Sequence, residues 1–128
     1  MTAAPRGCGG VLVVEDDADI LRAIVQVLQD EGETVRAAEN GRAALTMLRE
    51  PGVTLPCVIL LDLMMPVMDG WAFRAEQVRD PALADIPVIV LTADGQAIEK
   101  AALMNGANAL RKPVALETLL AAVAPYLT

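Results

Sequence analysis

The sequence predicts an α/β fold in which helices cover both faces of a parallel β-sheet. Five short apolar runs alternate with five stretches of helical periodicity along the 128 residues, as in repeated strand–helix units. The runs at 57–61 and 87–91 are apolar at every position, which is typical of strands buried on both faces. Aromatic residues make up only 2% of the chain, so aliphatic side chains have to fill the core. These observations predict one domain with a doubly wound sheet and right-handed crossovers.

The first predicted strand, 11–14, leads into a helix that aspartate side chains can cap. Gly32 ends this helix, because glycine readily takes the left-handed conformation common at helix ends. Residues 34–37 are then predicted as a short second strand. The helix is expected to pack on the sheet through apolar residues at helical spacing, namely Ile20, Ile24, Val27 and Leu28.

The middle of the chain repeats the alternation. A second helix follows Asn40 and ends at Pro51, since proline cannot continue a helix. The third strand is predicted at 57–61, a loop at 66–70 and a third helix at 71–79. The apolar residues expected to bury the second helix are Ala44, Leu45 and Leu48.

The last third of the chain supplies two more strand–helix units. Strands are predicted at 87–91 and 109–111, with a helix at 98–104 between them and a closing helix at 116–126. The whole domain is expected to span 11–128, after a flexible Gly-containing tail over residues 1–10.

Composition excludes several classes of function. The formal net charge is −7, and binding to nucleic-acid phosphates needs clustered Lys and Arg, so no direct nucleic-acid contact is expected. No apolar run reaches 18 residues, which predicts no membrane span. The chain has no histidine, which excludes histidine-dependent triads and histidine-rich zinc sites within it. Any phosphohistidine must therefore belong to a partner.

The two cysteines lie in different contexts. Cys8 belongs to the N-terminal tail, and Cys57 opens an apolar run where it would be a small buried hydrophobic residue. We therefore expect no disulfide framework and a reducing cytoplasmic location.

Polar side chains gather where the predicted strands end. In sheets of this kind ligands bind beyond the carboxyl ends of the strands, so these positions are the candidates for a site. Three or four carboxylates, one hydroxyl group and one ammonium group are predicted to meet there. The residues are Glu15, Asp16 and Asp17 after the first strand, Asp62 after the third, Thr92 after the fourth, and Lys112 with Pro113 after the fifth.

The acids require a cation or a proton, because two carboxylates about 4 Å apart repel by roughly 4 kcal/mol at an effective dielectric near 20. Oxygen ligands without His or Cys favour Mg²⁺. Asp16 is predicted to bind the metal. For Asp17 we prefer the alternative, that it caps the first helix.

Asp62 lies among apolar strand residues, where a lone carboxylate is unfavourable without a partner. It either bonds nearby backbone amides or acts as a nucleophile that forms an acyl phosphate, and we favour the nucleophile. Thr92 and Lys112 would supply the hydroxyl donor and positive charge that a phosphoryl group needs. A cis peptide bond before Pro113 would aim Lys112 inward.

These motifs together resemble the receiver domains of bacterial response regulators, over residues 11 to about 127. Each motif alone is weak, whereas the ordered set is specific. The resemblance implies a flavodoxin-like five-stranded sheet with strand order 2-1-3-4-5 and five helices. The motifs are Glu15-Asp16, Asp62 within Leu61–Gly70, Thr92-Ala93 and Lys112-Pro113.

The resemblance also implies roles. Asp62 would accept a phosphoryl group from a histidine kinase or a histidine phosphotransfer protein, and the change would switch contacts with an unknown downstream protein. The domain would be a signalling domain rather than an enzyme, although it would promote its own phosphorylation and dephosphorylation. Mg²⁺ would be held by Asp16, Asp62, the Met64 backbone carbonyl and, through water, Glu15. The phosphoryl group would be held by Thr92, the Ala93 backbone and Lys112.

One position departs from the family pattern. Receivers usually carry an aromatic residue three positions before the conserved lysine, and Ala109 stands there. A one-residue deletion would instead place Leu110 at that position. Neither residue is aromatic, so the usual Thr–aromatic switch is not expected to operate here.

Three alternatives remain open. The chain is a non-phosphorylated pseudo-receiver that only binds, or a receiver excised from a hybrid histidine kinase, or a phosphatase with an aspartate nucleophile. The last class needs a second Asp two residues after the first, where Met64 stands.

Overall fold

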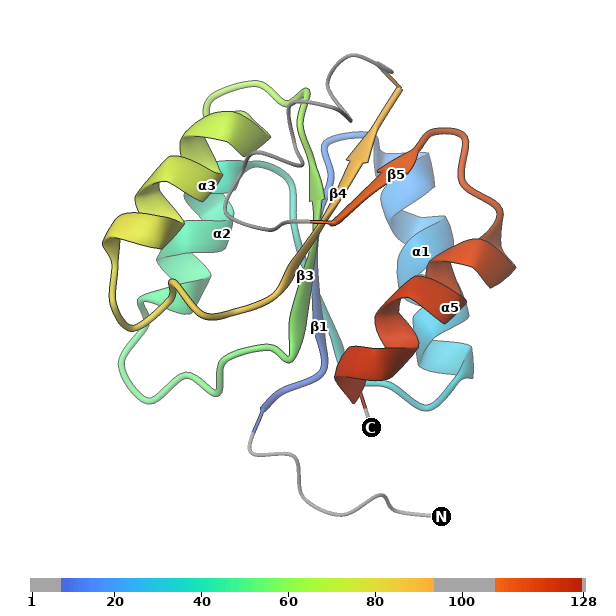
Figure 1. Cartoon of the computed structure of the whole chain (residues 1–128), viewed down its shortest axis with the longest axis horizontal. Coiled ribbons are helices and arrows are strands. Elements are labelled where there is room, and N and C mark those ends of the chain that lie inside the picture. Colours follow the sequence, from blue (N-terminus) through green and yellow to red (C-terminus); the bar gives the residue numbers. More distant parts are fainter. Residues whose placement is uncertain (1–7, 94–107, 128) are drawn as a thin grey trace.

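A computed structural model describes residues 8–93 and 108–127 as a five-stranded parallel sheet between two layers of helices (Figure 1). The strand order is β2-β1-β3-β4-β5, which confirms the predicted topology. Figure 1 shows α2 and α3 on one side of the sheet and α1 and α5 on the other. In chain order the elements are β1 (Val11–Val14), α1 (Ala18–Asp30), β2 (Val35–Ala38), α2 (Gly41–Leu48), β3 (Val58–Asp62), α3 (Gly70–Arg79), β4 (Val88–Thr92), β5 (Asn108–Arg111) and α5 (Leu116–Leu127).

The predicted elements lie close to these bounds. Strands β2, β3 and β4 each begin and end one residue later than predicted, which makes Asp62 and Thr92 the last residues of their strands. The described residues contain four of the five expected helices. The remaining helix, predicted at 98–104, falls outside the part of the chain that the structure describes.

The core has two layers, because successive strand residues point to opposite faces of the sheet. Leu12 and Leu61 face α2 and α3, whereas Val13 and Leu60 face α1 and α5. All residues of β1, β3 and β4 are buried, which explains why these strands are apolar at every position before Asp62 and Thr92 rather than alternating.

Helix α1 begins as expected and packs differently from the prediction. The Asp17 carboxylate accepts hydrogen bonds from the backbone N–H groups of Asp19 and Ile20 and caps the helix. Ile24 and Leu28 are buried, but Ile20 is 36% exposed, so the predicted stripe is shorter than expected. The reason is that the first turn of α1 lines an open pocket instead of packing on the sheet.

The amino ends of β1 and β3 are joined covalently, which corrects the expectation of two unpaired cysteines. Cys8 and Cys57 form a disulfide with a Cα–Cα distance of 5.1 Å. Backbone hydrogen bonds bring them together: Gly9 N–H donates to the Leu55 carbonyl at 2.7 Å, and Cys57 N–H donates to the Gly10 carbonyl at 2.7 Å. Residues 8–10 of the expected flexible tail are thus fixed to the sheet. The expectation of a reducing compartment rested on two unpaired thiols, and the disulfide removes that support.

Gly10 is required at its position. Its φ is +70°, and a Cβ there would lie 2.0 Å from the Thr34 carbonyl oxygen. The chain therefore enters β1 pressed against the backbone before β2.

None of the helices within residues 8–93 and 108–127 has the length and hydropathy needed to cross a bilayer.

Candidate functional site

The carboxyl ends of β1, β3, β4 and β5 lie at one edge of the parallel sheet and place the predicted polar residues there. Asp62 and Thr92 are the last residues of β3 and β4, and both are buried. Glu15 follows β1 directly and is 1% exposed. Lys112 follows β5, and its backbone N–H donates to the Thr92 carbonyl at 2.8 Å, which continues the β4–β5 pairing.

Three carboxylates meet at this edge, as the sequence analysis expected. Glu15, Asp16 and Asp62 each offer one oxygen, and these oxygens all lie within 4.8 Å of one another. Glu15 and Asp62 are buried, whereas Asp16 is exposed. One side of the cluster is therefore open to solvent and to ions. Asp17 stands outside it and caps α1.

Lys112 is the positive charge of the cluster. Its Nζ lies 2.6 Å from Glu15 Oε1 and 3.4 Å from Asp62 Oδ1. Burial lowers the pKa of Lys112, but the hydrogen bond to Glu15 and the charges of Asp62 and Glu15 outweigh burial and raise that pKa above its usual value. Lys112 is therefore charged at neutral pH. The Lys112–Pro113 peptide bond is cis.

Asp62 is a perturbed acid. Burial raises the pKa of Asp62 to about 7, together with the hydrogen bond that protonated Asp62 donates to the neighbouring Glu15 carboxylate and with the negative charge of Glu15. Lys112 and the Met64 backbone N–H, which donates to Asp62 Oδ1 at 3.2 Å, oppose this rise. Near neutral pH the acidic site thus holds either a proton or another cation beside Asp62.

The loop after β3 packs tightly against the end of the strand. Gly70 N–H donates to the Leu63 carbonyl at 3.0 Å, and a Cβ at Gly70 would lie 2.6 Å from the Asp62 carbonyl oxygen. The glycine therefore lets α3 start against the backbone of Asp62. Met64 and Val67 on this loop are 71% and 76% exposed.

The donor set fits a hard cation. It consists of carboxylate oxygens without histidine or thiolate, and Mg²⁺ prefers one or two carboxylates with the remaining positions taken by other oxygens. The single positive charge of Lys112 balances only one of the three carboxylates Glu15, Asp16 and Asp62. A bound Mg²⁺ ion would balance the remaining negative charge.

Ala109 stands three residues before Lys112, at the position where receiver domains usually carry an aromatic residue. It pairs with Val90 in the β4–β5 register and packs against the core that α2 and α3 cover. Leu110, the other candidate, packs on the opposite face with α1 and α5.

Sequence reasoning missed two features of the site. The first is the direct contact between Lys112 and Glu15, which lie 97 residues apart and were assigned to different ligands. The second is an apolar pocket beside Lys112 that includes Ile20 and Leu116. An apolar residue in the first helical turn was a signal for it, but the periodicity of α1 assigned Ile20 to the core.

Comparisons with known proteins agree with this geometry. Residues 11–124 match the family described as response regulator receiver domain. Protein PilH of Pseudomonas aeruginosa is 32% identical over 112 residues, which are 86% of this chain and 90% of PilH. Response regulator MprA of Mycolicibacterium vanbaalenii is 35% identical over 113 residues, which are 87% of this chain and 47% of MprA.

Solved structures give the same picture. Chemotaxis protein CheY4 of Vibrio cholerae superposes with a TM-score of 0.80 and 28% identity, covering 93% of this chain and 98% of that one. The receiver domain of a signal transduction histidine kinase from Syntrophus aciditrophicus gives a TM-score of 0.81 and 30% identity, covering 94% and 90%. The chain spans less than half the length of several curated relatives, such as 37% of a probable transcriptional regulator of Pyropia yezoensis.

Proposed function

The chain belongs to the response regulator receiver domains of two-component systems, and we propose that Asp62 is the residue that accepts the phosphoryl group. The observation that carries this proposal is the position of Asp62. Its buried carboxylate lies 3.4 Å from the Lys112 ammonium group and beside the carboxylates of Glu15 and Asp16. A structural aspartate has no need of a second and a third acid next to it.

Mg²⁺ is the cofactor we propose, in keeping with the family and with the all-oxygen donor set. Asp16, Asp62 and the Met64 backbone carbonyl would hold it, with Glu15 acting through water. When bound, the ion supplies the positive charge that lets carboxylates and a phosphoryl group occupy the same pocket.

The protein's own residues would then act mainly by position and charge. The Asp62 carboxylate attacks the phosphorus atom. The Lys112 ammonium, which contacts Glu15 Oε1 at 2.6 Å, pairs with the phosphoryl oxygens. The Thr92 hydroxyl and the Ala93 backbone N–H donate hydrogen bonds to those oxygens. The same groups position the phosphoryl group for its later hydrolysis.

The donor would be a phosphohistidine on a histidine kinase or a histidine phosphotransfer protein, because this chain has no histidine of its own. From the receiver family we also propose a cytoplasmic location and a downstream protein that reads the phosphorylated state. The likeness to a receiver domain of a signal transduction histidine kinase also supports a place within a hybrid kinase.

Acetyl phosphate with Mg²⁺ tests the proposal. Intact-mass spectrometry should show an adduct of about 80 Da, the mass of one phosphoryl group, that is lost in alkali. Asp62→Asn should abolish the adduct, whereas Asp69→Asn, which removes the N-cap carboxylate of α3 outside the cluster, should retain it. No adduct and no spectral response to beryllofluoride would instead establish the pseudo-receiver alternative.

A further inference from the structure

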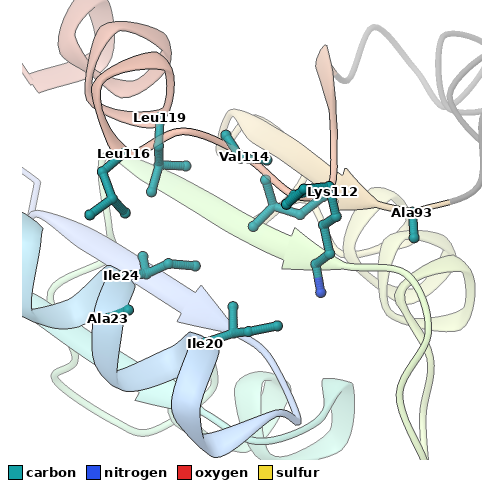
Figure 2. A pocket seen from close by; sticks show the side chains of 10 residues that line it. Ile20, Ala23, Ile24, Ala93, Lys112, Val114, Leu116 and Leu119 are labelled. Atoms are coloured by element: carbon teal, nitrogen blue, oxygen red, sulfur yellow. The ribbon is translucent and has the colours of Figure 1, made fainter.

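An apolar pocket opens beside the acidic site, between the start of α1 and the segment that joins β5 to α5 (Figure 2). Its volume is about 350 Å³. Ile24, Leu91 and Leu119 form a buried floor, while Ile20 and Leu116 stand at the rim with 36% and 41% of their surfaces exposed. Pockets of this size and apolar character are typical of small-molecule sites.

The described lining of the pocket includes one charged group, and that group belongs to the acidic site. Among the lining residues within 8–93 and 108–127, Lys112 alone carries a charge. Figure 2 shows the Lys112 side chain crossing one end of the pocket with its nitrogen turned toward the end of β3. The same nitrogen lies 3.4 Å from Asp62 Oδ1. A molecule in the pocket would therefore have an apolar body and would place its anionic end beside Asp62.

We propose that this pocket is a subsite for the apolar acyl group of a small acyl phosphate that phosphorylates Asp62 directly. The inference rests on the proposed role of Asp62 and adds a binding site for the acyl chain of such a donor. Phosphorylated Asp62 is itself an acyl phosphate, so a donor of the same bond type transfers its phosphoryl group without a large uphill step. An ordinary phosphate ester does not meet this condition.

The reaction balances without an added proton or oxidant. An oxygen of the ionised Asp62 carboxylate forms a bond to phosphorus, and the bond between phosphorus and the bridging oxygen of the donor breaks. The electron pair of the broken bond stays on that oxygen, which leaves as the carboxylate of a fatty acid. The apolar chain of this leaving group stays in contact with Ile20 and Leu116 until the acid dissociates.

Chain length is the property that the pocket should select. Burying one methylene group raises affinity about fourfold. Butyryl phosphate, with two methylenes more than acetyl phosphate, should therefore phosphorylate the protein about fifteenfold faster at equal subsaturating concentration. The rates are measured by intact mass in the presence of Mg²⁺.

Variants locate the selectivity. Leu116→Asn, at the exposed rim, should lower the ratio of the butyryl to the acetyl rate to about one, which corresponds to the loss of that apolar contact. Val67→Asn is the matched control, because Val67 is a large exposed apolar residue on the loop after β3 that is not among the residues lining the pocket. It should keep the ratio of about fifteen.

A second measurement does not depend on transfer. Hexylphosphonate, which cannot donate its phosphorus group, should shift the methyl NMR signals of Ile20, Leu116 and Leu119 in the Mg²⁺-loaded protein. Methylphosphonate at the same concentration should leave them unchanged.

The outcomes separate this inference from the proposed function. A normal rate with acetyl phosphate and a ratio of the butyryl to the acetyl rate near one would overturn the subsite alone. A Leu116→Asn defect confined to transfer from a histidine phosphotransfer protein would also overturn the subsite, because the pocket would then bind a side chain of that protein. No labelling by any acyl phosphate overturns the subsite, and if the spectral response to beryllofluoride is also absent, both proposals are overturned.

Discussion

The two ends of the β1–β3 pair differ sharply although the strands between them are alike. At the carboxyl ends, three carboxylates cluster and two of them contact one ammonium group, and burial together with Glu15 raises the pKa of Asp62. At the amino ends, a disulfide and two backbone hydrogen bonds of 2.7 Å hold the chain together. The carboxyl ends thus bring mutually repelling carboxylates together, whereas the amino ends are joined by covalent and hydrogen bonds.

This difference shows how a small domain tolerates a cluster of buried carboxylates. The buried residues between the two ends of β1 and β3 are apolar, so residues at one end do not contact residues at the other. We expect changes at the amino end to act on stability and to leave the chemistry unaltered. Changes at the carboxyl end should alter the chemistry and, through the raised pKa of Asp62, also the stability. Four predictions test that division.

The largest expected effect is on chemistry. Lys112→Ala removes the positive charge beside Asp62 and should slow phosphorylation by acetyl phosphate about 10²- to 10³-fold, as for the loss of one electrostatic donor in an active site. Arg111→Ala, an exposed neighbour in β5, is the control and should react at the wild-type rate. Equal rates for the two variants would contradict the assigned role of Lys112.

The second prediction concerns the disulfide. Its two cysteines lie 49 residues apart, and opening a loop of that length should lower the free energy of unfolding by about 4 kcal/mol. Urea unfolding of the oxidised and the reduced protein measures the change. The double variant Cys8→Ser/Cys57→Ala should unfold like the reduced protein with or without dithiol. A large change in the acetyl phosphate rate would show that the two ends are not independent.

The third prediction is a pH dependence without divalent cations. The pKa of Asp62 is raised from 3.8 to about 7 in the folded protein, so between these values the folded state binds more protons than the unfolded state. The free energy of unfolding contributed by Asp62 should therefore fall as the pH rises from about 4 to about 7, by on the order of 2 to 4 kcal/mol, and stay level above.

Asp62→Asn isolates that contribution. The stability of the variant minus that of the wild type should grow across the same pH range, as measured by urea midpoints. A constant difference would mean that Asp62 titrates alike in the folded and unfolded states.

The smallest expected effect compares two glycines. Gly10→Ala should lower the free energy of unfolding by about 2 to 3 kcal/mol, because a positive φ combines with a Cβ placed 2.0 Å from the Thr34 carbonyl oxygen. Gly32→Ala has a similar φ of +85° but meets nothing within 4 Å, and should lose about 1 kcal/mol. Equal losses would mean that conformation alone decides, and that Gly10 is not pressed against its neighbour.

The sequence predicted the carboxyl end of the pair better than the amino end. Parallel strands bring their last residues to one edge whatever the loop details, so Glu15, Asp62 and Lys112 followed from topology. The pairing of Cys8 with Cys57 depends instead on backbone hydrogen bonds that extend β1 beyond its apolar run, and no side-chain pattern records them. Ile20 was misplaced for a related reason, since helical spacing does not show where a helix projects beyond its sheet.

The disulfide also has a mechanical consequence. Residues 8–57 form a closed covalent ring that includes β1, α1, β2 and α2. If the chain is pulled by its two ends, force passes across the sulfur bridge, and the 49 peptide units inside the ring never become taut. Single-molecule stretching of the oxidised protein should therefore release about 160 to 180 Å less contour length than the reduced protein, at 3.3–3.6 Å per residue.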